Sequence, residues 1–109
     1  MTEIIYKICS QSEWDKAAER EVYTGSSDDE RDGFIHLSTW EQVPGTLEKH
    51  FKGQQDLLLI AVDEAKIKEH LKYEASRDGD LFPHLYGQLQ LDAVIWVKPV
   101  DRALEGEKP

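Results

Sequence analysis

The chain has 109 residues, of which 22 are acidic and 13 basic, giving a net charge of −9. This length predicts one domain, because typical domains run to ~100–150 residues. The acidic balance argues against nucleic acid or an anionic membrane as the main partner, because phosphate groups attract a surplus of Lys and Arg.

The single cysteine, Cys9, excludes an internal disulfide and a cysteine-based metal site. The first residues lack a basic start and a long apolar stretch, so we expect no signal peptide and a cytoplasmic location. The longest apolar run, residues 57–62, is far shorter than the ~20 residues that a membrane span needs.

The first half of the chain predicts alternating strands and helices. In chain order these are a strand at 4–9, a helix to about Arg20 behind a Ser10–Glu13 capping box, an acidic loop at 26–31, a strand at 33–38, and a helix through about Phe51 that is capped by Thr39. Pro44 is expected in the first turn of that helix, where a missing N–H costs little.

The second half begins with a near-continuous apolar run, which is typical of a strand buried on both faces. The expected order is a strand at 56–63, a short helix at 64–70, a short strand at 71–75, a loop at 76–87, a strand at 93–97 and a charged, frayed tail from about Asp101. Roughly five strands and two or three helices in mixed order predict a single α+β domain.

Two polar segments, residues 31–39 and 74–86, suggest a shared polar pocket. Each places an Arg-Asp-Gly turn before an apolar stretch that contains a histidine, His36 or His84. Strands that only need to be buried do not use such residues. Ligand contact or proton transfer is one interpretation for each histidine, and a hydrogen-bonded structural histidine is the other.

The candidate ligand-binding residues surround these histidines in the sequence. They are Arg31, Ser38 and Thr39 in the first segment and Ser76, Arg77 and Tyr86 in the second. Arg77 is the best anion donor, since a guanidinium can clamp phosphate or carboxylate in a fork. The alternative is that Arg77 pairs with Glu74 or Asp80 and only fastens its loop. Glu74 itself is a candidate general base, a ribose-hydroxyl acceptor or that salt partner.

Three familiar motifs are missing from the sequence. There is neither a glycine-rich phosphate loop nor a Gly-x-Ser-x-Gly elbow. The histidines lack His-x-x-x-His spacing, so a metal site would need His36, His50 or His84 to converge from separate elements. No metal is therefore predicted.

The sequence resembles the small proteins catalogued as domain of unknown function 952. The likeness covers nearly the whole chain and is carried by Ile5-Tyr6-Lys7-Ile8, Trp14, Tyr23-Thr-Gly25, Asp32-Gly-Phe-Ile-His-Leu-Ser38, Gln42, Thr46, His50-Phe51, Leu57 to Val62, Tyr73-Glu74, Ser76-Arg77 and Leu81-Phe-Pro-His-Leu-Tyr-Gly87. The resemblance implies an ADP-ribosylation-like fold, a split mixed sheet whose enzymes hold NAD between two small sheets.

The resemblance also implies roles for single residues. His36 matches an early-strand residue that holds ribose, and Tyr73 or Tyr86 weakly matches an aromatic that stacks on nicotinamide. The late glutamate of such enzymes has no counterpart, because His84 falls near its place and an imidazole does not supply a fixed negative charge. Glu74 would have to substitute from another element.

These observations lead to a hypothesis and two alternatives. The hypothesis is a pocket protein that binds or processes NAD, ADP-ribose or a related phosphorylated ribose, with Arg77 on phosphate, His36 on a ribose hydroxyl, His84 as acid or base, and Glu74 as orienting residue. NAD would then be a substrate, and no resident cofactor is expected. One alternative is a non-catalytic module for a small anionic ligand, and the other is that both segments are internally satisfied loops.

Overall fold

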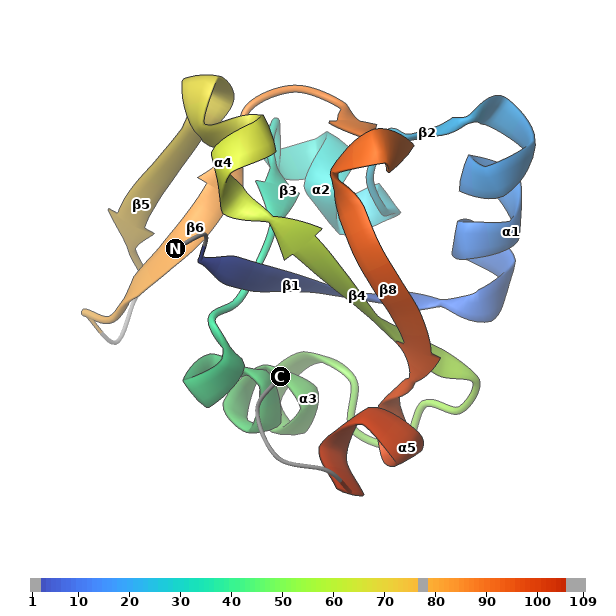
Figure 1. Ribbon diagram of the computed structural model, residues 1–109. Coiled ribbons are helices and arrows are strands. Elements are labelled where there is room, and N and C mark those ends of the chain that lie inside the picture. The colour runs from blue at the N-terminus through green and yellow to red at the C-terminus, as the bar shows by residue number, and fades with distance from the viewer. Residues whose placement is uncertain (1–2, 77–78, 106–109) are drawn as a thin grey trace.

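The computed structural model describes residues 3–76 and 79–105, which build three small antiparallel sheets (Figure 1). The first sheet has the order β1-β4-β8, from β1 (Ile4–Ser10), β4 (Leu57–Asp63) and β8 (Val94–Pro99). The second has the order β3-β6-β5, from β3 (Ile35–His36), β5 (Leu71–Ala75) and β6 (Leu81–Leu85). The third pairs β2 (Val22–Tyr23) with β7 (Leu89–Gln90). The α+β class is confirmed, but the strand pairs of the described chain are antiparallel rather than mixed.

Helices and short 3₁₀ turns connect these strands. The α-helices are α1 (Gln11–Arg20), α2 (Ser27–Asp32), α3 (Val43–His50), α4 (Glu64–Ile67) and α5 (Val100–Glu105). The 3₁₀ turns are Trp40–Gln42, Lys68–His70 and Leu91–Ala93. Within the described residues, none of these helices is long and apolar enough to cross a membrane.

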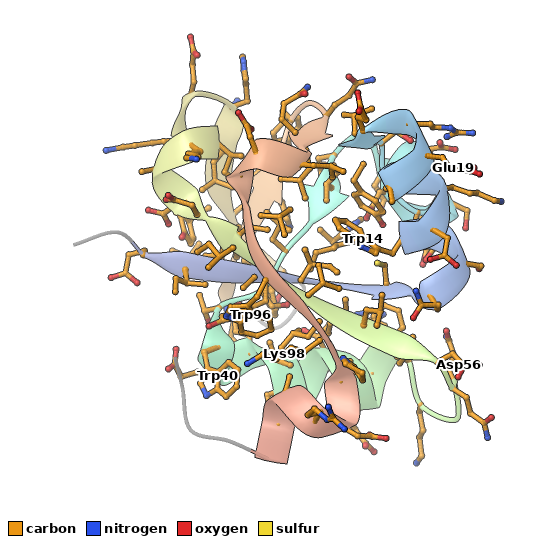
Figure 2. The ribbon with its side chains drawn as sticks, turned by 45° about the vertical axis from the view of Figure 1, so that its right-hand side comes forward. Trp14, Glu19, Trp40, Asp56, Trp96 and Lys98 are labelled. Carbon is orange, nitrogen blue, oxygen red and sulfur yellow. The ribbon has the colours of Figure 1, made fainter. Side chains whose placement is uncertain are left out.

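The sheet β1-β4-β8 forms the centre of the core. Its middle strand β4 buries Leu58 to Val62, as its continuous apolar sequence predicted. Alternate residues of β1 and β4 face two separate apolar clusters, one beneath α1 and one beneath α3 and α5. Figure 2 shows Trp14 with the first cluster and Trp40 and Trp96 with the second.

Residues 76–87, expected as a loop, contain strand β6, which is the middle strand of the second sheet. Proline is unusual in a middle strand, because it lacks the N–H that a ladder needs. The structure places Pro83 where the β3 ladder ends: its carbonyl accepts the Leu37 N–H at 3.0 Å. A hydrogen-bonded antiparallel pair exchanges two such bonds, and here the second cannot form. Strand β3 is therefore short, ending at His36.

Residues 26–31, expected as an acidic loop, belong mainly to helix α2. Ser26 caps it by accepting the Asp29 N–H at 3.2 Å, while the Asp29 carboxylate accepts the Ser26 N–H at 2.9 Å. The helix ends at Gly33, whose φ of 85° is in the left-handed region that glycine tolerates.

The segment from Asp101, expected as a charged frayed tail, instead forms α5 as far as Glu105. Val100 and Ala103 anchor it, because both are buried in the cluster beneath α3 and α5. Asp101 and Arg102 therefore sit on a packed helix, and residues 106–109 of the expected tail lie outside the described residues.

A backbone bridge between Tyr6 and Ser38 joins the two three-stranded sheets. Each residue donates its N–H to the other's carbonyl at 2.8 Å. This bridge ties the end of the β3 segment to the buried strand β1. As a result, α2 and β3 lie against β1, and the second sheet is fixed to the buried central sheet.

Candidate functional site

The two histidines singled out from the sequence lie side by side on the second sheet. His36 and His84 are cross-strand partners in the β3–β6 ladder, and their ring centroids are 5.6 Å apart. The ring of Phe34 stacks on His84 at 4.0 Å and 21° and lies 5.2 Å from the ring of Tyr86. We call Phe34, His36, Glu74, His84 and Tyr86 the imidazole cluster.

His84 is oriented by a carboxylate from the neighbouring strand β5. Its Nδ1 lies 2.8 Å from Oε1 of Glu74, and the Tyr86 hydroxyl donates to the same oxygen at 2.6 Å. The hydrogen bond from Tyr86, followed by that from His84, holds the pKa of Glu74 below its ordinary value. An ionised Glu74 accepts from Nδ1–H, and Nε2 of His84 has no partner among the described residues.

His36 is engaged at both ring nitrogens. Nδ1 lies 2.6 Å from Oδ1 of Asp29, and Nε2 lies 3.0 Å from Oδ2 of Asp32. The Nδ1 contact is a hydrogen bond, and Nε2 lies within ion-pair distance of the second carboxylate. His36 therefore has no nitrogen free for a ribose hydroxyl in this arrangement, and a ligand would have to displace Asp32.

Asp29 is the buried centre of the network around His36. Its Oδ2 lies 2.8 Å from Nζ of Lys7, and both side chains are almost completely buried, at 2% and 5% exposure. Oδ1 also accepts the backbone N–H of His36 at 3.1 Å. Burial alone would raise the pKa of Asp29, but the His36 hydrogen bond and the Lys7 ammonium outweigh it and hold the pKa far below its ordinary value.

Gly25 allows this carboxylate to sit where it does. Its φ of 110° lies in the left-handed region, and a Cβ built on it would come within 2.8 Å of the Cβ of Asp29. Any side chain at position 25 would therefore press on the first turn of α2.

The remaining candidate residues are spread over three places. Arg31 is exposed and reaches the cluster only through Asp32, which its Nε contacts at 3.1 Å. Ser38 is buried and faces Thr46 of α3 at 3.1 Å. The backbone N–H of Thr39 donates to Gln42 at 3.0 Å. Neither Ser38 nor Thr39 has a contact with the imidazole cluster among those described.

The turn after β5 holds the last two candidates. The Ser76 hydroxyl is buried without a hydrogen-bond partner among the described residues, next to the turn closed by Asp80 and Gly79. Arg77, the predicted phosphate clamp, lies outside the described residues. Its role remains a prediction.

A hollow of about 220 Å³ adjoins the imidazole cluster. Phe34 and Asp29 belong to its lining, together with Thr24, Glu30, Gly33, Ile35, Gly87 and Gln88. The two imidazoles flank this hollow rather than line it, which differs from the shared pocket expected. Over residues 3–76 and 79–105, no group of three or more His, Cys, Asp or Glu residues is placed to hold a metal ion.

The sequence analysis missed the carboxylates that orient His36. Asp29 was assigned to a loop, although Ser26-x-x-Asp29 before Gly33 has the pattern of a capped helix. Lys7 was treated as part of an ordinary strand, although a lysine inside a buried apolar run requires a partner for its charge. These two signals together would have predicted a buried ion pair.

Comparisons with known proteins agree on one family. The family model described as "Protein of unknown function (DUF952)" matches residues 8–97. The crystal structure of protein CC0527 from Caulobacter crescentus is similar at 47% identity and a TM-score of 0.84, over 88% of this chain and 84% of that one. Its solution NMR structure has a TM-score of 0.78, over 88% and 83%. No curated protein matches. The chain belongs to the DUF952 family.

Proposed function

We propose that the imidazole cluster binds a phosphorylated ribose, such as that of NAD, ADP-ribose or a related nucleotide, and that His84 transfers a proton during its hydrolysis or transfer. The single observation that carries this proposal is the orientation of His84. Glu74 holds its Nδ1 at 2.8 Å, Phe34 stacks on its ring, and Nε2 is left without a described partner.

A carboxylate that holds one nitrogen of an imidazole, while the other nitrogen stays free, is the arrangement of a general acid–base catalyst. Glu74 fixes the tautomer in which Nε2 of His84 accepts a proton, and its charge stabilises the imidazolium that forms. The side chain of His84 is 13% exposed, so Nε2 would act close to the protein surface without being fully solvated. A ribose hydroxyl or a water molecule is the proton donor that this arrangement suits.

An ADP-ribosylation-like architecture is the finer fold assignment that goes with this function. The two three-stranded sheets joined at Tyr6 and Ser38 support it, since a split pair of small sheets is what the family resemblance implies. The missing late glutamate argues for a variant reaction. Glu74 supplies a carboxylate from β5, but this carboxylate is hydrogen-bonded to His84 and would act on a substrate through that imidazole.

A second candidate function is a binding module without catalysis. The observation that favours it is the saturation of His36, whose two nitrogens are both held by aspartates. A site of this kind is already satisfied in the free protein and would recognise a small ligand mainly through Phe34, Tyr86 and the rim of the neighbouring hollow.

Isothermal titration calorimetry with NAD, ADP-ribose and ribose 5-phosphate tests both functions. Binding by the wild-type protein that weakens in His84→Gln, without being abolished, would place the ligand on the imidazole cluster. His50→Gln is the matched control, because His50 is an exposed histidine at the end of α3. Absence of binding by all three ligands at millimolar concentration would refute the proposal.

Product analysis then separates the enzyme from the module. Each ligand that binds is incubated with wild type and with His84→Gln, and products are resolved by chromatography. Turnover that disappears in His84→Gln, while some binding remains, supports proton transfer by His84. Binding without turnover of any of the three ligands supports the module.

A further inference from the structure

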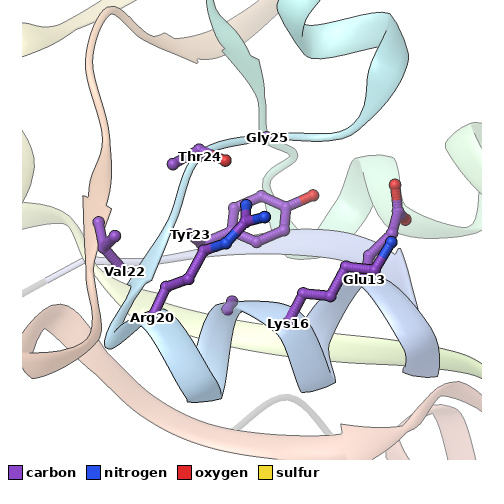
Figure 3. Close-up of a pocket in the computed structure, with 8 residues that line it drawn as sticks. Glu13, Lys16, Arg20, Val22, Tyr23, Thr24 and Gly25 are labelled. Carbon is purple, nitrogen blue, oxygen red and sulfur yellow. The ribbon is translucent and has the colours of Figure 1, made fainter.

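A second hollow, of about 130 Å³, lies between α1 and strand β2. Its lining includes Lys16 and Arg20 from the helix and Tyr23 and Thr24 from the strand and the residue after it. Figure 3 shows the side chain of Arg20 extending from α1 across the ring of Tyr23, whereas that of Lys16 extends toward Glu13, which also lines the hollow. Thr24 also lines the hollow beside the imidazole cluster, so the two hollows adjoin.

The charges at this hollow are unusual for so acidic a chain. Lys16 and Arg20 are four residues apart on α1, a spacing at which like charges destabilise a helix. Neither has a carboxylate partner among the described residues, although the chain contains 22 acidic side chains. Glu13 also lines the hollow, and its carboxylate accepts the N–H of Ser10 at 3.1 Å. The helix dipole accounts for Arg20 in the last turn but not for Lys16.

The tyrosine in the lining adds an independent observation. Tyr23 is 2% exposed, and its hydroxyl is buried without a hydrogen-bond partner among the described residues. Burial raises the pKa of Tyr23, so the group remains an O–H donor. A buried donor without an acceptor destabilises a fold. Because Tyr23 lines the hollow, an oxyanion bound there would supply the missing acceptor once the side chains that cover the hydroxyl move aside.

We propose that this hollow is a binding site for a phosphoryl group, either inorganic phosphate or the phosphate end of a larger molecule. Two cations match the double charge of a phosphate, and the guanidinium of Arg20 can donate two parallel hydrogen bonds to its oxygens. The volume suits one phosphate but not a whole nucleotide, since sites for drug-sized ligands span roughly 300–1,000 Å³. The proposal does not depend on the function proposed for His84.

An NMR titration with inorganic phosphate tests this site, with the backbone amides of Thr24 and Gly25 as reporters. We expect saturable shifts with a dissociation constant on the order of 1 mM. Lys16→Gln and Arg20→Gln should each weaken binding by about tenfold, because each removes a charge-assisted contact. Arg102→Gln on α5 is the matched control for charge and should change the affinity by less than about twofold.

Tyr23→Phe separates a built site from diffuse attraction to positive charge. It removes a hydroxyl that lacks a partner, so the fold should be retained while the affinity for phosphate falls by about fivefold. If ribose 5-phosphate also binds and its binding weakens in Arg20→Gln, the natural ligand is the phosphate end of a larger molecule. If only inorganic phosphate binds, the ligand is the free ion. No shifts up to about 20 mM phosphate, or equal losses in Arg20→Gln and Arg102→Gln, would overturn the proposal.

Discussion

The second sheet places two histidine–carboxylate pairs side by side, and they differ in whether a ring nitrogen of the histidine is left without a partner. In the Asp29–His36 pair the carboxylate is buried, Lys7 neutralises it, and both imidazole nitrogens are engaged. In the Glu74–His84 pair the carboxylate is partly exposed and one imidazole nitrogen has no described partner. The same two residue types thus make a structural anchor in one place and a candidate acid–base group in the other.

Burial explains this difference. A buried carboxylate is stable only when its oxygens are paired, so Asp29 requires Lys7, Ser26 and His36 together. Glu74 remains in contact with water, and two hydrogen bonds are enough to orient it. His36, beside the buried carboxylate, is therefore held at both nitrogens, whereas His84, beside the hydrated carboxylate, is held at Nδ1.

The largest effect is expected from breaking the buried pair. Asp29→Asn leaves the Lys7 ammonium buried without its counter-charge and should lower the free energy of unfolding by about 3–5 kcal/mol. Urea unfolding followed by circular dichroism measures this loss. The control is Asp32→Asn at the exposed end of the same network, which should cost much less. Equal losses in the two variants would contradict the assignment of Asp29 as anchor.

Lowering the pH should reduce the stability contributed by both pairs, and it should reduce that of the Asp29–His36 pair more. The pKa of Asp29 and that of Glu74 are both lowered in the folded state, so the unfolded chain takes up protons first as the pH falls. Their stabilisation is complete above the ordinary pKa values and is lost as the pH falls through the folded ones. Unfolding curves between about pH 5 and pH 2 should therefore show a steep acid-induced loss. That loss should flatten strongly in Asp29→Asn and only slightly in Glu74→Gln, whose charge is screened by water.

The smallest effect is expected from removing the tyrosine hydroxyl at the Glu74–His84 pair. Tyr86→Phe removes the hydrogen bond that most lowers the pKa of Glu74, so that pKa should rise toward the ordinary value of 4.5. A titration of the Glu74 side-chain carboxyl by ¹³C NMR measures the change. The stability of the protein should barely move, because the contact is exposed. An unchanged Glu74 titration would show that His84 and Lys72, rather than Tyr86, lower its pKa.

Local sequence patterns predicted much of the core correctly. The Ser10–Glu13 capping box, the buried strand β4 and Pro44 in the first turn of α3 all follow from residues close together in the chain. Such features depend on short-range contacts that the sequence displays directly. The short strand β5 was also placed at its observed bounds.

The candidate site depended on contacts that no local pattern contains. Proline at position 83 concealed strand β6, since its position at the end of the β3 ladder becomes visible only once the strands are paired. The register that sets His36 opposite His84 is likewise a tertiary property. The sequence predicted that the two histidines belong together but assigned His36 to the ligand, whereas two aspartates of α2 occupy its nitrogens.

Gly25 limits which amino acids can occupy position 25. Because its hydrogen points at the Cβ of Asp29 and leaves no room for a methyl group, bulk at this position would displace the carboxylate from Lys7. Gly25 and its neighbour Thr24 also line the second hollow, between α1 and β2. Because glycine has no side chain, one turn of backbone can border the buried ion pair on one flank and the proposed phosphate site on the other.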